Sequence, residues 1–263
     1  MVRRRLDAEL VAQGLFPDTD TAARAVMAGD VSTTDRRLDH PGDQVKPGIV
    51  LHVRADSPYV SRGGIKLERG LSYFGVDPTG MSCLDVGCST GGFTDCLLTH
   101  GAAHVLAVDV GRADFDWRLR QDPRVELLER TNICDVPGEG RDGTVDLAVC
   151  DVSFTSVTVV LPAVMQLLAP AGAFLTLVKP QFEAPRGDVG EGGVVRDGRV
   201  RQAALDKVSL AFAEAGLCVQ GSVESPIKGH KGNVEYLLFG RRGSAPTILD
   251  LKAVVSGGAV ALA

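Results

Sequence analysis

The sequence predicts an α/β fold with a mostly parallel sheet, preceded by a small α+β module. From Met81 onward, apolar strand-like runs alternate with helical segments, which indicates a sheet covered on both faces. Several of these runs end in a glycine-rich turn or a charged residue, as expected where loops at the edge of an α/β sheet carry function. Residues 1–54 differ, because they combine two helical patterns with short β-like pieces around Gly and Pro.

Residues 1–54 are predicted to form one small domain with a thin core. Apolar residues of the first helix recur at spacings of four, one and four, namely Leu6, Leu10, Val11 and Leu15. A second helical pattern covers residues 21–27 and is ended by Gly29. β-like pieces follow at Val31 and at residues 49–53.

The larger domain is predicted to cover residues 61–243, after a linker of residues 55–60, and a helix with Lys66 precedes its first strand. We expect strands at Ser82–Val86, His104–Val110, Val125–Leu128, Val145–Val152, Ala173–Val178, Cys218–Val223 and Val234–Gly240. Helices are expected at Gly92–His100, Phe115–Gln121, Thr155–Leu168 and Val200–Ala215. Residues 185–199 are rich in glycine and charge and form a long loop of a kind that is often functional. Residues 244–263 are expected to be a poorly packed extension.

The composition is that of a globular protein in a reducing compartment. Of the 263 residues, 44% are hydrophobic and 23% charged, and no apolar run approaches membrane-spanning length. The basic N-terminus lacks the apolar segment of a signal peptide, so we expect a cytoplasmic protein. The six cysteines form no C-x-x-C pair and are expected to be small buried residues, not metal ligands. With a net charge of −5, nucleic-acid binding would need a local basic face.

The segment from Cys83 to Asp95, CLDVGCSTGGFTD, is predicted to bind a nucleotide-like cofactor. Its glycines let the backbone approach a ligand closely, and the helix N-terminus that follows favours an anionic group. The spacing matches neither G-x-G-x-x-G nor a P-loop. Asp109 closes the next strand, 24 residues after Asp85, where a carboxylate can accept hydrogen bonds from ribose hydroxyls. Two acids in these places are typical of S-adenosylmethionine-dependent methyltransferases.

Two opposite charges follow the next pair of predicted strands. Asp151 ends the run VDLAVCD, and Lys179 ends the apolar run in LVKPQFE, 28 residues later. A lysine at a strand end is commonly a surface residue whose stem covers apolar surface. Ligands of open α/β sheets bind at the carboxyl edge, however, so these two charges are expected to lie beside the cofactor.

The order Lys66, Asp151, Lys179, Glu235 resembles the K-D-K-E tetrad of FtsJ-like ribose 2′-O-methyltransferases. The motifs YVSRGGIKL, LDVGCSTGGFTD, ERTNICDV, DVSF, LVKPQFE and GNVEYLL resemble the TlyA family of haemolysin A-like rRNA methyltransferases over about residues 3–240. The resemblance implies a Rossmann-like class I methyltransferase sheet, S-adenosyl-L-methionine as cofactor, and an N-terminal S4-type RNA-binding domain. Nothing in the residues of the chain suggests a metal.

The same resemblance implies particular site residues. Cofactor binding is expected for Asp85, Gly87, Ser89, Gly91, Gly92, Phe93, Asp109, Val110, Asn132 and Ile133. RNA binding by residues 1–54 is expected for Arg3, Arg4, Arg5, Arg24, Arg36 and Arg37. The turn after Gly29, DVSTTDRRLD, carries acids where such modules usually have a basic hairpin, which weakens the expected RNA affinity. The implied reaction is 2′-O-methylation of cytidine in rRNA, with ribosomal subunits as partners and a monomer away from them.

Lys179 is expected to steer and deprotonate the ribose 2′-hydroxyl. An ordinary lysine is almost fully protonated at neutral pH, so this role needs surroundings that disfavour its charge. Asp151 would hold the amine in position, while Lys66 and Glu235 would orient the hydroxyl and tune the local charge. In-line attack on a methyl group then needs mainly positioning.

Other interpretations remain open from the sequence. Lys66 lies on a helix rich in charge and Glu235 on an alternating strand, so either could face solvent. A membrane-active haemolysin would need an apolar span or a basic amphipathic helix, and neither is found. A non-catalytic RNA-binding protein would lack a member of the tetrad, and all four are present. Within enzymes, another structured RNA such as tRNA is the alternative substrate, because shape and phosphate contacts would decide recognition.

Overall fold

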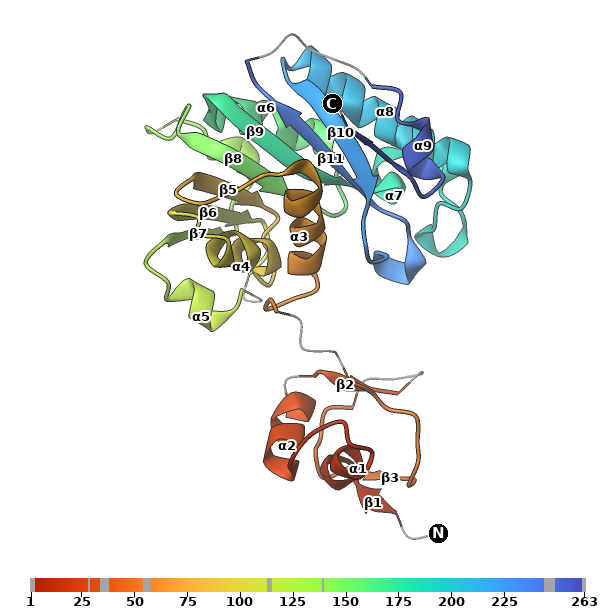
Figure 1. Cartoon of the computed structure of the whole chain (residues 1–263). Helices are drawn as coiled ribbons and strands as arrows, with labels where there is room; N and C mark the ends of the chain where they lie inside the picture. Colours follow the sequence, from red (N-terminus) through yellow and green to blue (C-terminus); the bar gives the residue numbers. More distant parts are fainter. Residues whose placement is uncertain are drawn as a thin grey trace. The chain divides into compact units, whose positions relative to one another are not determined.

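The computed structural model describes residues 3–27, 29–33, 38–53, 58–112, 115–138, 140–243 and 249–261. The chain divides into two compact units, Met1–Ser57 and Pro58–Ala263 (Figure 1). Each unit has its own hydrophobic core. Among the described residues, no helix has both the length and the apolar character needed to cross a membrane.

The first unit is a small α+β structure, as the pattern predicts. Its elements are β1 (Arg4–Arg5), α1 (Leu6–Ala12), α2 (Thr19–Met27), β2 (Val31–Ser32), β3 (Gln44–Val45) and β4 (His52–Val53). β1 pairs with β3 and β2 with β4, both antiparallel. The apolar stripe of α1 supplies Leu6 and Leu10, which pack against Ala22 and Val26 of α2.

The second unit is built around an eight-stranded sheet in the order β12-β10-β11-β9-β8-β5-β6-β7. Its strands are β5 (Ser82–Val86), β6 (His104–Asp109), β7 (Val125–Glu129), β8 (Val145–Cys150), β9 (Leu168–Val178), β10 (Cys218–Glu224), β11 (Tyr236–Arg241) and β12 (Ala259–Ala261). β5 to β9 are parallel, whereas β11 is antiparallel to both neighbours. The predicted α/β class with a mostly parallel sheet is therefore confirmed.

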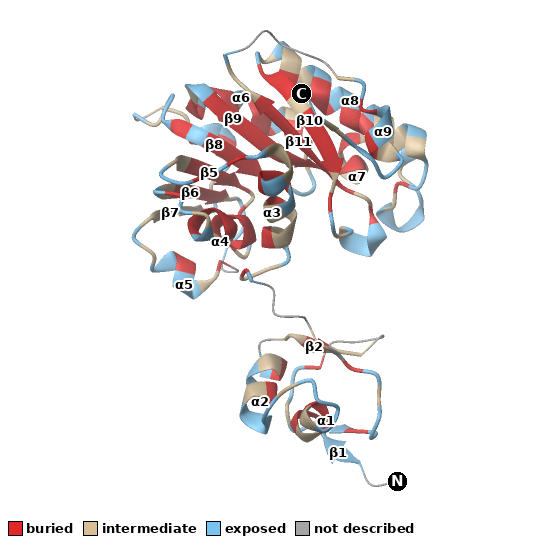
Figure 2. Cartoon of the chain, viewed as in Figure 1, coloured by how far each residue is buried: buried red, intermediate tan, exposed pale blue. Residues whose placement is uncertain are grey.

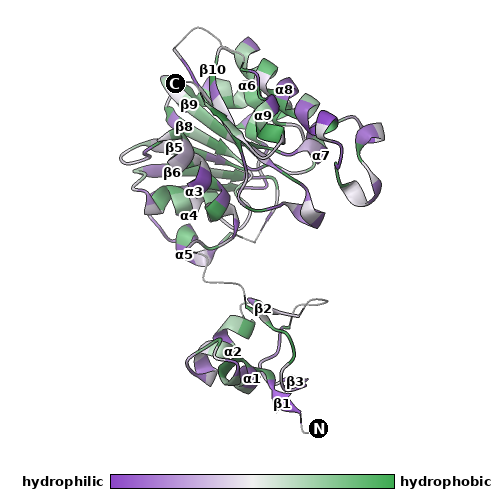
Figure 3. Cartoon of the chain, turned by 45° about the vertical axis from the view of Figure 1, so that its right-hand side comes forward, coloured by the Kyte–Doolittle hydropathy of each residue, from purple (hydrophilic) through white to green (hydrophobic). Residues whose placement is uncertain are grey.

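Helices cover both faces of this sheet (Figure 1). They are α3 (Gly63–Phe74), α4 (Gly92–Thr99), α5 (Trp117–Arg120), α6 (Val157–Leu167), α7 (Pro180–Glu183), α8 (Gly198–Glu214) and α9 (Lys252–Val255). Because alternate strand residues point to opposite faces, Leu84 and Val86 join the core beneath α6 and α8, and Cys83 joins the core beneath α3 and α4. Strands enclosed in this way are buried along most of their length (Figure 2) and mostly hydrophobic (Figure 3).

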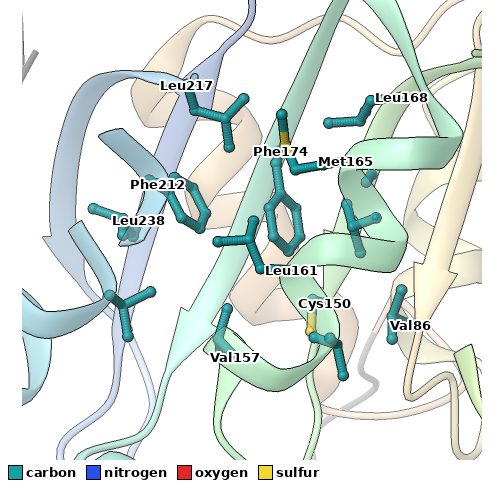
Figure 4. Close-up of a cluster of buried hydrophobic side chains, with 14 of the residues drawn as sticks. Val86, Cys150, Val157, Leu161, Met165, Leu168, Phe174, Phe212, Leu217 and Leu238 are labelled. Carbon is teal, nitrogen blue, oxygen red and sulfur yellow. The ribbon is translucent and has the colours of Figure 1, made fainter. Parts of the chain in front are cut away.

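The core beneath α6 and α8 fixes the strands that carry the charged residues (Figure 4). Phe174 of β9 stacks on Phe212 of α8, with ring centroids 5.1 Å apart. Cys150, the last residue of β8, is fully buried in the same core. Interiors of this kind are close-packed, so the ends of β8 and β9 are held in fixed positions.

The C-terminal segment differs from the expectation of a poorly packed extension. Residues 249–261 pack against the sheet, since Leu251 and Val254 are fully buried beside α8. β12 pairs antiparallel with β10, opposite Gly221. A side chain at Gly221 would place its Cβ 2.2 Å from the Val260 carbonyl, so the glycine permits this edge pairing. The pairing covers three residues, too few to give a recognisable strand pattern.

Candidate active site

Four charged side chains meet at the carboxyl edge of the sheet. Lys179 follows β9 directly and Asp151 follows β8. Glu235 precedes β11, whose amino end lies at the same edge because that strand runs antiparallel, with Tyr236 opposite Val178. Lys66 comes from the first turn of α3. The structure brings together the four residues predicted as catalytic, and their part in the reaction stays a prediction.

Each lysine of this tetrad faces a carboxylate. Lys66 Nζ lies 2.6 Å from Glu235 Oε2 and 3.9 Å from Asp151 Oδ2. Lys179 Nζ lies 2.5 Å from Asp151 Oδ1 and donates a hydrogen bond to Ser153 Oγ at 2.9 Å. Asp151 therefore lies between two ammonium groups. Lys179 and Glu235 are 7% and 3% exposed, so removing Asp151 or Lys66 would leave a buried charge without its nearest partner.

Glu183 ties the segment after β9 to the segment after β8. Lys179 is followed by Pro180, which takes the first position of α7. A backbone N–H at this position would have no partner within the helix, so a proline, which has none, is well tolerated. The buried Glu183 carboxylate at the end of α7 accepts hydrogen bonds from Ser156 Oγ (2.5 Å), the Val157 amide (2.7 Å) and Lys207 Nζ (2.9 Å). Lys179 and the loop with Asp151 and Ser153 are thus held by one shared anchor.

A cavity of about 530 Å³ opens beside the tetrad, within the range typical of small-molecule sites. Asp151 lines it, so the cavity and the tetrad share that residue. The remaining lining residues come from the ends of β5 and β6, from the segments that follow β5, β6, β7 and β8, and from α6. They are Val86, Gly87, Ser89, Val108, Asp109, Val110, Gly111, Thr131, Asn132, Ile133, Val152, Ser153, Phe154, Thr155, Val159 and Val160.

Asp109 is held in place by backbone donors. Its Oδ2 accepts from the Ser89 amide at 2.8 Å and its Oδ1 accepts from the Gly111 amide at 2.7 Å. Each carboxylate oxygen can accept a further hydrogen bond from a ligand hydroxyl. Gly87, at φ +80°, passes so close to the backbone at Asp151 that a Cβ would lie 3.1 Å from that carbonyl. The glycine therefore allows the segments that follow β5 and β8 to approach each other closely.

The ten predicted cofactor residues fall into two groups. Those that line the cavity are Gly87, Ser89, Asp109, Val110, Asn132 and Ile133. The other four lie beside it and serve the packing of α4. Phe93 is buried in the core beneath α3 and α4, Gly91 adopts φ +93° against Leu119, and Gly92 packs against Ser61. The fourth is Asp85.

Asp85 is fully buried and is not among the residues that line the cavity. Its Oδ2 accepts a 2.6 Å hydrogen bond from Thr94 Oγ1 of α4, and its Oδ1 has no hydrogen-bond partner in the part of the chain that the structure describes. Burial raises the pKa of the Asp85 carboxyl to about 7, and the hydrogen bond from Thr94 opposes that shift. The contact with Thr94 therefore joins the end of β5 to α4 through a buried polar group.

The buried carboxyl of Asp85 makes stability depend on pH. The folded state keeps the proton up to about pH 7, whereas the unfolded chain releases it near pH 4, so stability falls as pH rises between these values. We expect Asp85→Asn to gain up to about 4 kcal/mol relative to the wild type between pH 4 and pH 7. Urea unfolding across this range measures the gain, because the cost of burying the amide does not depend on pH.

The exposed Asp206→Asn on α8 provides the matched control and is expected to show no such pH dependence. An Asp85→Asn variant whose stability runs parallel to the wild type at every pH would contradict a raised pKa at this position.

Two residues at the site were not predicted from the sequence. Ser153 lies in the motif DVSF, which gives no separate sign of its role. Its Oγ nevertheless accepts a hydrogen bond from Lys179 Nζ. Phe154 is 92% exposed at φ +65°, a conformation that is strained for a bulky residue. Its ring lies 5.2 Å from that of Phe182, whose face lies 5.9 Å from Lys179 Nζ. The signal that could have found Phe154 is an aromatic residue directly after a charged strand end.

The predicted RNA-binding arginines of the first unit are partly neutralised by neighbouring acids. Arg4 pairs with Glu9 at 2.8 Å and Arg5 with Asp7 at 2.6 Å. Arg3 and Arg24 are exposed, and their guanidinium groups donate to Gln44 and Thr21. Arg36 and Arg37 lie outside the described residues.

A second polar cluster lies between α3 and α4. Glu68, Cys96 and His100 place one potential ligand atom each within 4.8 Å of the others. Glu68 Oε2 lies 2.6 Å from His100 Nε2 and also accepts from the Tyr59 hydroxyl. The sequence analysis missed this cluster, although a Cys and a His four residues apart share one face of a helix.

A family model described as FtsJ-like methyltransferase matches residues 59–242. Over 239 residues the chain is 44% identical to the 16S/23S rRNA (cytidine-2′-O)-methyltransferase TlyA of Mycobacterium tuberculosis, which covers 90% of this chain and 89% of that protein. It is 39% identical over 234 residues to Hemolysin A of Brachyspira hyodysenteriae, with 89% and 98% covered.

A solved structure supports the fold over nearly the whole chain. A Streptococcus thermophilus protein that carries a hemolysin name aligns with a TM-score of 0.75 and 38% identity. The alignment covers 97% of this chain and 95% of that one.

Proposed function

Because the chain belongs to the FtsJ-like methyltransferase family, we propose that it is an S-adenosylmethionine-dependent enzyme that methylates a ribose 2′-hydroxyl, of cytidine in ribosomal RNA. The observation that carries this proposal is the double position of Asp151, which lines the cavity and contacts both lysines of the tetrad. A methyl donor in the cavity and a hydroxyl at Lys179 would then be neighbours, as in-line transfer requires.

The cavity residues fit the proposed cofactor. Asp109 offers carboxylate oxygens for ribose hydroxyls, and Asn132 and Ile133 offer a polar and an apolar contact for a base. S-adenosylmethionine would supply an electrophilic methyl group on a sulfonium. These features support the proposal through the chemistry of the residues present.

Cofactor affinity provides a test of Asp109. We expect Asp109→Ala to weaken binding of S-adenosylhomocysteine about 10- to 100-fold, since charge-assisted hydrogen bonds to two hydroxyls are lost. Equilibrium calorimetry measures the affinity, and the exposed Asp135→Ala in the neighbouring turn serves as the control. Equal affinity of Asp109→Ala and the wild type would show that the ribose does not lie at the end of β6.

The tetrad would act on the substrate hydroxyl. Lys179 is held by Asp151 and Ser153 so that its protonated Nζ can donate a hydrogen bond to the 2′-oxygen and, once a proton has been released to solvent, can accept the proton of the 2′-hydroxyl. Lys66, fixed by Glu235, keeps a second positive charge near the oxygen as negative charge develops there. These residues position the hydroxyl and transfer its proton, and they take no other part in the reaction.

The surroundings of the tetrad support a nucleotide substrate. The exposed ring of Phe154 at the rim can stack on a base taken out of its own stack. The first unit is proposed to add RNA affinity as an S4-type module, for which its exposed Arg3 and Arg24 are the available support. Arg4 and Arg5 would have to leave their acidic partners to contribute.

The test is transfer of labelled methyl groups from S-adenosylmethionine to unmodified small subunits, large subunits and tRNA. We expect label in rRNA, at a nucleotide whose 3′ linkage resists alkaline hydrolysis because its 2′-oxygen is blocked. Label in tRNA alone would move the substrate to the alternative class. Label at an alkali-sensitive linkage, or no label on any RNA, would overturn the proposal.

A further inference from the structure

The loop between β10 and β11, residues 225–233, forms a compact structure at the edge of the active site. We refer to it as the basic loop. Its base is closed by a hydrogen bond from the Ser225 amide to the Glu235 carbonyl at 2.9 Å. Within it, the Gly229 amide donates to Asn233 and the Gly232 amide donates to Gly229. A loop with this many internal hydrogen bonds presents its side chains from a fixed backbone.

The basic loop packs directly against the tetrad. A Cβ added at Gly229 would lie 1.9 Å from Glu235 Oε1, so the glycine backbone lies against the carboxylate that binds Lys66. The residues on either side of Gly229 are therefore held near the tetrad. They are Lys228, His230 and Lys231, and all three are exposed.

The basic loop has an uncompensated charge. Residues 225–233 contain two lysines and no acid, in a chain whose net charge is −5. Among the described residues, neither Lys228 nor Lys231 forms an ion pair or a side-chain hydrogen bond. Lys231 adopts φ +55°, an uncommon conformation for a residue with a side chain. Exposed, unpaired lysines beside a reactive centre in an acidic chain indicate an anionic partner.

Asn233 joins the basic loop to the long loop of residues 185–199. This buried amide donates to the Gly193 carbonyl at 2.9 Å and accepts from the Val195 amide at 3.0 Å. The stem of Lys231 passes Gly192. The long loop balances its own charges, because Arg186 and Arg196 are matched by Asp188 and Glu191 in residues 185–196. The local positive charge therefore belongs to Lys228 and Lys231.

We propose that Lys228 and Lys231 of the basic loop bind the phosphate on the 3′ side of the nucleotide whose ribose is methylated. The inference rests on the proposed function and adds to it a phosphate contact made by this unit. In RNA, the 2′-oxygen and the 3′-phosphate are borne by adjacent ribose carbons. A 2′-oxygen at Lys179 therefore brings its 3′-phosphate to the surface next to the tetrad, where these two ammonium groups are available.

The experiment compares Lys228→Ala/Lys231→Ala with the wild type in methylation of ribosomal subunits and in filter binding of the same subunits between about 50 and 200 mM salt. We expect KM and Kd for RNA to rise about tenfold, with kcat and the affinity for S-adenosylhomocysteine unchanged. The slope of log Kd against log salt should fall by about one for each lysine that contacts a phosphate. Lys228→Arg/Lys231→Arg should restore the wild-type KM, Kd and salt slope. The exposed Lys252→Ala on α9 is the control and should leave all three unchanged.

Failure of the phosphate contact can be distinguished from failure of the proposed function. If the double alanine variant keeps the wild-type KM, Kd and salt slope while methylation proceeds, the phosphate contact is wrong and the proposed function stands. If the wild type labels no RNA, the proposed function fails. Filter binding alone then tests whether the basic loop contacts a phosphate of the RNA. An equal salt slope for variant and wild type in that measurement also overturns the contact.

Discussion

Lys179→Met is expected to lower kcat for methyl transfer by about 10³-fold, the size of a typical loss of proton transfer by a positioned side chain. Methionine has a similar length and fits the nearly buried site, but it cannot hold or move a proton. In this variant the Asp151 carboxylate still has Lys66 as a neighbouring cation, because Lys66 Nζ lies 3.9 Å from Asp151 Oδ2. Single-turnover transfer of labelled methyl to the RNA substrate measures the loss.

Lys179→Arg separates two roles for this side chain. Arginine keeps the positive charge but is not deprotonated in proteins, so it should be nearly as inactive as methionine if Lys179 accepts the proton. Lys252→Met is the matched control on an exposed lysine. Activity retained in Lys179→Arg would reduce the role of Lys179 to charge, and activity retained in Lys179→Met would remove it from the mechanism while leaving the family assignment intact.

Gly229→Ala is expected to lower kcat about 100-fold without contact between residue 229 and the substrate. Its φ of −74° suits any residue, so backbone strain is not the cause. The new methyl group would overlap Glu235 Oε1 at 1.9 Å and push that carboxylate away from Lys66. Steady-state kinetics should show the loss in kcat, with S-adenosylhomocysteine affinity close to that of the wild type and a lower thermal stability, because the buried Glu235 carboxylate is separated from its cation.

A double-mutant cycle tests whether Gly229→Ala acts through Glu235. The variant Gly229→Ala/Glu235→Ala should be no slower than Glu235→Ala alone, because the displaced group is already absent. Gly187→Ala is the control, since a Cβ there meets nothing within 4 Å. Additive losses in the double variant would show that the substitution damages the site by another route.

The tetrad could be predicted because its members obey simple rules of position. Asp151 and Lys179 end apolar strands, and parallel strands bring their carboxyl ends to one edge. Asp85 could not be assigned in the same way. Whether it faces the cavity or α4 depends on the pleat and on Thr94, a contact between side chains that spacing does not encode.

Tertiary contacts explain the other differences. The pairing of Arg4 with Glu9 and of Arg5 with Asp7 reduces the charge that the sequence appeared to offer to RNA. The position of Gly229 against Glu235, and with it the importance of the basic loop, follows only once β10 and β11 are paired. The packing of Leu251 depends on α8 and β10, which lie far from it in sequence.

The place of β11 in the sheet has a consequence for synthesis of the chain. β10 leaves the ribosome before β11, yet β11 lies between β10 and β9 and is the strand that joins them. Until β11 has emerged, β9 presents an unpaired edge and Lys66 has no Glu235 to bind. Insertion of a late strand between two earlier ones is a long-range event, so it is expected to be the last step in the folding of this unit. A nascent chain therefore acquires its complete tetrad only after most of its length has been made, and shorter products are structurally incompetent for the reaction.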